Sequence, residues 1–137
     1  MYRKVRKIIS LLLLAVFVMP HSAFAVDSDI QPYASISFKI KDASLIESNG
    51  TLAIDYYVQA NTSVSKIGVS SITLHDATAG TAKNYSGITT SGKMTNGRKV
   101  LGSGVSGHRY YATVVLCAFN SNGSGATYTV TTNYVTV

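Results

Sequence analysis

Two histidines beyond residue 25 are the first candidates for chemistry. His75 directly precedes Asp76, and an imidazole beside a carboxylate supplies half of the base-and-orienter arrangement of a hydrolase. Adjacent side chains on a strand point to opposite faces, however, so these two would not converge there. The second imidazole is His108, and no G-x-S-x-G elbow supplies a nucleophile. We therefore predict that the chain has no catalytic residues and is not an enzyme.

Metal and cofactor sites have little support in the sequence. The chain has one cysteine, Cys117, so a cysteine-based zinc site and an intramolecular disulfide are both excluded. Glu47 is the only glutamate, and the aspartates form neither a D-x-D-x-D calcium loop nor a converging pair of carboxylates. The glycines around Ser103 lack the lysine of a phosphate loop. We expect no metal and no cofactor.

One segment offers a binding surface instead. Residues 109–120 alternate so that Tyr110 and every second residue after it share one face, which we expect to fill the core. The opposite face then carries an apolar row, and its predicted binding residues are Tyr111, Val115 and Phe119. Exposed rows of this kind often mark partner surfaces, and tyrosine rings also stack on sugars. The alternative is that residues 90–107 or an N-terminal arm, residues 26–33, cover the row.

The first 25 residues have the pattern of a secretory signal peptide. Four basic residues precede an apolar run over residues 11–19, which is shorter than the ~20 residues of a membrane-spanning helix. Ala23 and Ala25 stand at the small-residue positions of a cleavage site, and we predict cleavage before Val26. The alternative is an uncleaved membrane anchor. The expected product is a secreted, extracellular domain with no membrane span.

The charge balance changes when this segment is removed. The full chain has a formal net charge of +6, but the remainder after residue 25 has eight bases against six acids. We therefore expect no nucleic-acid partner. No acid follows Asp76, whereas five bases do. Such a basic half suits an anionic polymer or membrane surface, or is a solvated face with an incidental bias.

Strand patterns run through the chain from residue 34 onward. Period-two alternation recurs and no helical apolar stripe occurs, so we predict an all-β domain. Asn49-Gly50 predicts a type I′ hairpin, and a change of phase near Ser70-Ser71 predicts a bulge. Residues 90–107 are rich in Gly and Lys and are expected to be mainly irregular. The predicted strands cover residues 34–41, 44–47, 51–59, 66–75, 83–89, 99–102, 109–120 and 126–137, with a turn over 76–82.

Residues 107–125 resemble the penultimate strand of fibronectin type III and immunoglobulin-like domains. In that signature a glycine stands shortly before a tyrosine, alternating apolar positions follow, and an asparagine and a glycine-containing hairpin close the strand. Gly107, Tyr110, Asn120 and Gly123 take those parts here. The resemblance implies a two-sheet sandwich of about seven strands over residues 34–137, with Gly107 and Tyr110 in structural roles and Tyr110 as the tyrosine corner. The family's buried tryptophan is missing, and Tyr56 is the candidate for its place.

The overall plan also resembles small, secreted, uncharacterised β-sandwich proteins of Gram-positive bacteria, which implies a compartment rather than an activity. We therefore expect a secreted, non-enzymatic binding module for an unidentified protein or cell-surface polymer. Two alternatives stay open: a carbohydrate- or cell-wall-polymer-binding module, and a toxin-like or inhibitory effector.

Overall fold

The computed structural model describes residues 35–137, and the predicted signal peptide, its cleavage site and the arm 26–33 lie outside them. Strands account for 78% of the described residues and none of these residues is helical, so the all-β prediction is confirmed. It follows that this part of the chain has no helix long and apolar enough to cross a membrane. The strands are β1 (Phe38–Ser48), β2 (Thr51–Asp76), β3 (Thr81–Ser103), β4 (Arg109–Phe119), β5 (Gly125–Thr131) and β6 (Val135–Thr136).

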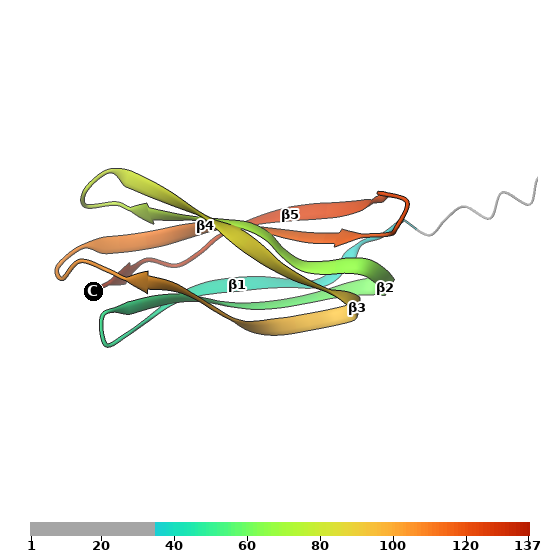
Figure 1. Ribbon diagram of the computed structural model, residues 1–137, viewed down its shortest axis with the longest axis horizontal. Coiled ribbons are helices and arrows are strands. Elements are labelled where there is room, and N and C mark those ends of the chain that lie inside the picture. Colours follow the sequence, from blue (N-terminus) through green and yellow to red (C-terminus); the bar gives the residue numbers. More distant parts are fainter. Residues whose placement is uncertain (1–34) are drawn as a thin grey trace, which may run out of the picture. The chain divides into compact units, whose positions relative to one another are not determined.

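All strand pairs are antiparallel and form one curled sheet around the long strand β2. The first part of β2, residues 51–59, lies between β1 and the last part of β3. Its second part, residues 64–76, lies between the first part of β3 and β4. β5 and the short β6 pair with β4. In Figure 1, β3 accordingly crosses from the side of the molecule that carries β4 to the side that carries β1.

The core forms where alternating apolar side chains of these strands meet inside the curl. Its fully buried members come from β1, both parts of β2 and β4, and Tyr56 and Tyr110 are also buried in it. Burial of aliphatic side chains is the main stabilising contribution here, at about 25 cal/mol per Å² of apolar surface. The largest fully buried side chains are Leu45, Leu52, Ile54, Ile67, Ile72 and Leu116.

Three local predictions are confirmed. Asn49 and Gly50 both have positive φ, 50° and 80°, and join β1 to β2 as the type I′ hairpin requires. The pairing of β2 with β4 shifts register between Val69 and Ser71, which is the predicted bulge. The bulge allows Val69 and Ile72 to enter the same core although they differ in phase. Residues 109–119 form a strand between β2 and β5, as expected of a central strand.

The strand boundaries differ from prediction in several places. The expected short strands 51–59 and 66–75 are one strand, β2, and 34–41 and 44–47 are replaced by the single strand β1. Residues 90–103, expected to be mainly irregular, continue β3, because backbone pairing with β2 holds this polar edge strand without burying it. The expected strand 126–137 is interrupted at residues 132–134. Six strands in residues 35–137 therefore replace about seven short ones.

Candidate functional site

The predicted binding row does not form a continuous exposed apolar strip. Tyr111, Val115 and Phe119 lie on the face of β4 opposite its core residues, and each is half-buried. Between the last two, Cys117 is fully buried. The flanking residues are largely polar: Ser71 and Thr129 pair with Val115 from either side. Of the predicted residues, Tyr111 alone belongs to a larger aromatic cluster.

Four side chains form that cluster, which we call the aromatic ladder: His75, Tyr111, Tyr134 and Arg109. The rings of His75 and Tyr111 are stacked with centroids 4.4 Å apart and an interplanar angle of 6°. The Tyr111 and Tyr134 rings follow at 5.0 Å, and the Arg109 guanidinium carbon lies 3.9 Å from the Tyr134 ring centroid. Tyr134 is 49% exposed. The ladder therefore presents a ring and a cation together at the surface.

Pairing and a strand interruption position the ladder. His75 at the end of β2 is the register partner of Tyr111 in β4, so their rings share one face. Tyr134 is the last residue of the interruption between β5 and β6. There, the Thr132 hydroxyl accepts a hydrogen bond from the Ala112 N–H at 2.9 Å. The Asn133 amide bonds both the N–H and the carbonyl of Leu45, at 3.2 and 3.0 Å. Side chains thus replace regular strand pairing just before Tyr134.

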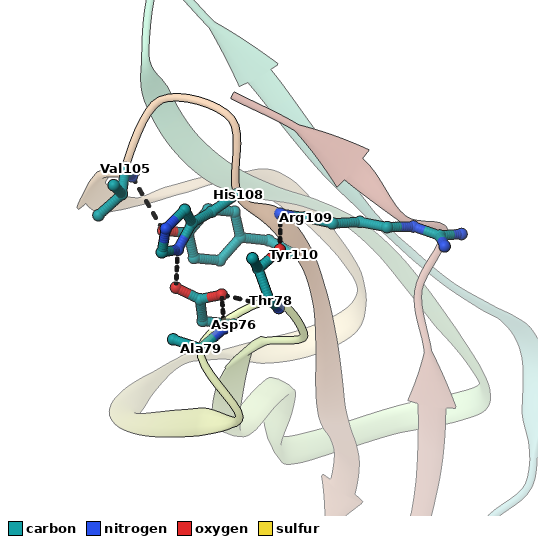
Figure 2. A network of polar contacts seen from close by, with 7 residues as sticks. All are labelled: Asp76, Thr78, Ala79, Val105, His108, Arg109 and Tyr110. Carbon is teal, nitrogen blue, oxygen red and sulfur yellow. Dashed lines mark hydrogen bonds and ion pairs between the residues drawn. The ribbon is translucent and has the colours of Figure 1, made fainter.

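A polar network fixes the neighbouring loops, as Figure 2 shows. One oxygen of Asp76 accepts hydrogen bonds from the N–H groups of Thr78 and Ala79 at 3.0 and 2.9 Å. The other oxygen lies 2.7 Å from Nδ1 of His108. Burial raises the pKa of Asp76, but the bonds from His108 and from the Ala79 N–H lower it more, so the net pKa lies below its ordinary value. The carboxylate therefore ties the β2–β3 turn to the segment before β4.

Tyr110 and Gly107 make further hydrogen bonds in the segment around the start of β4. The Tyr110 hydroxyl accepts a hydrogen bond from the Val105 N–H at 2.9 Å, five residues upstream. Gly107 has φ of 82°, a conformation that favours glycine, and its N–H donates to the Val137 carbonyl. In addition, the Arg109 N–H donates to the Thr78 hydroxyl at 2.9 Å. The backbone at the start of β4 is thereby held from both flanking loops.

The histidine–aspartate pair differs from the one that the sequence offers. The Asp76 carboxylate contacts the imidazole of His108, whereas Nε2 of His75 lies 3.1 Å from the Thr113 hydroxyl. The sequence offers His108 as the second imidazole but does not pair it with Asp76. The antiparallel pairing of β2 and β4 brings the two residues together, because it places the end of one strand beside the start of the other. Among residues 35–137, no group of three or more His, Cys, Asp or Glu residues is placed to hold a metal ion.

A shallow pocket of about 360 Å³ adjoins the ladder. Its lining includes His75, Tyr111 and Tyr134, and the β2–β3 turn closes its other side. The pocket lies within the range of about 300–1,000 Å³ in which small-molecule sites fall. The geometry can accommodate a ligand group against an aromatic wall. No protein-family model, curated protein or solved structure matches this chain significantly.

Proposed function

We propose that this chain is a secreted, non-enzymatic binding module with an immunoglobulin-like, fibronectin type III-like sandwich fold. Its ligand is a protein or polymer of the cell surface, and the aromatic ladder is its binding surface. The single observation that carries the proposal is the stack of His75, Tyr111, Tyr134 and Arg109, half-buried at its base and exposed at Tyr134.

Two features support the proposed fold. The two parts of β2 have different neighbours. The first part lies between β1 and the end of β3, and the second part lies between the start of β3 and β4. That division is what two packed sheets sharing two long strands would need. The hydrogen bond from the Val105 N–H to the Tyr110 hydroxyl, at the start of β4, supports the proposal, because a tyrosine corner makes a bond of this kind to backbone a few residues upstream.

The composition of the ladder supports binding. Tyrosine and arginine are the residues that most often dominate binding energy in interfaces, because each combines a large apolar surface with polar groups. The ladder's rings already hold one another in place, so little side-chain entropy remains to be lost on binding. The export pattern of residues 1–25 supports a location of this surface outside the cell.

A carbohydrate- or cell-wall-polymer-binding role is the second candidate. It is favoured by the Arg109 guanidinium over the Tyr134 ring, next to the pocket of about 360 Å³. A sugar can stack on an exposed tyrosine while an anionic substituent pairs with the guanidinium. The lack of any acid after Asp76 adds to this preference for an anionic polymer.

Sedimentation with intact cells of the producing organism tests the proposal. We expect the mature protein to sediment with the cells, and Tyr134→Ala to weaken that binding by about tenfold because it removes the exposed ring. Tyr128→Ala is the matched control, since Tyr128 has a similar exposure of 41% and lies outside the ladder. Equal binding by wild type and Tyr134→Ala, or an equal loss in the control, would refute the role of the ladder.

Two further arms separate the candidates. Protease treatment of the cells abolishes binding if the partner is a protein and spares it if the partner is a polymer. Raised ionic strength weakens binding to an anionic polymer, because salt screens the charge of Arg109. If raised salt leaves binding to protease-treated cells unchanged, an anionic polymer bound through the charge of Arg109 is ruled out.

A further inference from the structure

A second surface carries polar side chains in register across three strands. Asp42 of β1, Tyr57 of β2 and Asn96 of β3 form one row. Ser44, Asp55 and Arg98 form the next row, and we call the six residues the polar grid. Their chain neighbours Ala43, Ile54, Tyr56 and Val58 are buried in the core, so the grid lies on the opposite face of these strands. It shares no residue with the aromatic ladder.

The grid lines an open, shallow pocket of about 420 Å³, to which all six of its residues contribute. This volume falls within the usual range for small-molecule sites. Tyr57 supplies the aromatic surface and is 36% exposed. Its hydroxyl lies 3.2 Å from the Met94 sulfur, in the next row of β3. The ring therefore leans along the sheet toward Met94, and it remains partly exposed where Tyr57 lines the pocket.

The second row of the grid is fixed by an ion pair. Nε and one terminal nitrogen of Arg98 donate to the two carboxylate oxygens of Asp55 at 2.6 and 2.7 Å. The Arg98 hydrogen bond holds the pKa of Asp55 below its ordinary value, against a smaller opposing effect of burial. Because a guanidinium has five N–H donors, three remain for a ligand. The pair thus acts as a preformed donor at the edge of the pocket.

We infer that the polar grid is a binding site for an uncharged sugar residue of a glycan. A pyranose ring has an apolar C–H face and a rim of hydroxyl groups that both donate and accept. Tyr57 offers a surface for the C–H face, while the Asp42 carboxylate and the Asn96 amide on either side can bond the hydroxyls. Two carboxylates against one guanidinium give the grid a net negative charge, which disfavours an anionic ligand. Apart from the tyrosine surface, little in the grid suits an apolar peptide.

Titration calorimetry with neutral and charged oligosaccharides tests this inference. The probes are cellopentaose, chitopentaose, maltopentaose and mannopentaose, with a polygalacturonate oligomer as the anionic comparison. We expect at least one neutral probe to bind the mature protein with a Kd below about 1 mM, and binding to be insensitive to salt. Tyr57→Ala and Asp42→Ala should each weaken it by about tenfold. Melting temperatures close to that of wild type show that both variants are folded.

Control variants separate this site from the aromatic ladder. Tyr128→Ala matches Tyr57 in exposure and should bind the neutral probe as wild type does. Tyr134→Ala should also leave oligosaccharide binding unchanged, whereas it weakens binding to cells if the ladder is the cell-binding surface. The inference is overturned if no neutral probe binds, if the anionic oligomer alone binds, or if binding survives Tyr57→Ala. Loss with Tyr134→Ala in place of Tyr57→Ala would assign the sugar to the ladder instead.

Discussion

Asp76 shows what a single side chain contributes at this end of the molecule. It is the last residue of β2, and its carboxylate accepts hydrogen bonds from two N–H groups of the next turn. A turn starting at such a residue was predictable from sequence, because aspartate readily bonds backbone groups two or three residues ahead. The partner on its other oxygen, His108, lies 32 positions later in the chain. Local sequence preferences do not reach that far.

The lowered pKa of Asp76 makes stability depend on pH. A carboxylate with a lower pKa in the folded than in the unfolded state contributes stability above its unfolded pKa, and that contribution is lost as pH falls through the folded pKa. Asp76→Asn should therefore destabilise the domain at pH 7, and its difference from wild type should shrink below about pH 5. Urea unfolding midpoints measured from pH 7 to pH 3 check this.

Asp55→Asn is the matched control, because the pKa of Asp55 is also lowered, in its case by the hydrogen bond from Arg98. Its pair with Arg98 lies more in the open, with side chains 38% and 58% exposed, so the effect should have the same sign and be smaller. If the difference in unfolding midpoint between wild type and Asp76→Asn widened in acid, the pKa of Asp76 would not be lowered in the folded state.

The bulge in β2 accommodates a change of phase among the apolar residues of this strand. One strand serves two sets of neighbours, and its apolar residues change phase between Val69 and Ile72. The sequence predicts this irregularity because the phase change is local. The close approach of β3 at the same place was not predictable. A Cβ on Gly68 would lie 2.4 Å from the Ile88 carbonyl oxygen, at a φ of 141°.

Gly68→Ala should consequently destabilise the fold. Both the strained φ and the clash with backbone act against alanine, and we expect a loss of more than about 1 kcal/mol in the free energy of unfolding. Gly92→Ala is the control: its φ of 134° is similar, but a Cβ added there would meet no atom within 4 Å. Equilibrium urea unfolding compares the two. If both variants lost the same free energy of unfolding, the positive φ alone would explain the destabilisation, and the close approach of β3 to Gly68 would contribute nothing.

The whole molecule depends on packing, because its one cysteine rules out an internal disulfide. Cys117 lies on the outer face of β4, opposite the core, and is nevertheless 0% exposed. Its register partners are Gly68 of β2 and Thr127 of β5. Burial raises the pKa of the Cys117 thiol, so little reactive thiolate is present at neutral pH.

Thiol labelling should accordingly report global unfolding. In native buffer we expect an aromatic disulfide reagent to react with Cys117 only as fast as the domain unfolds, and in urea within seconds to minutes. Ser121→Cys in a Cys117→Ala background supplies the rate for an exposed thiol. Native labelling at that reference rate, or a disulfide-linked dimer on a non-reducing gel, would show that the face of β4 opens.

The amino-acid sequence by itself determined the all-β class, the Asn49-Gly50 hairpin, the bulge near Ser70 and the central position of residues 109–119. Each of these depends on the φ preferences of one or two residues or on which faces of one strand are apolar, and both are local properties. Only the tertiary structure decided that β3 is a strand over its whole length, since its order comes from pairing with β2 rather than from its own pattern. The same holds for the Asp76–His108 pair and for Tyr134 beside Tyr111. These contacts join residues distant in the chain, and register between strands is set by how all the buried faces fit together.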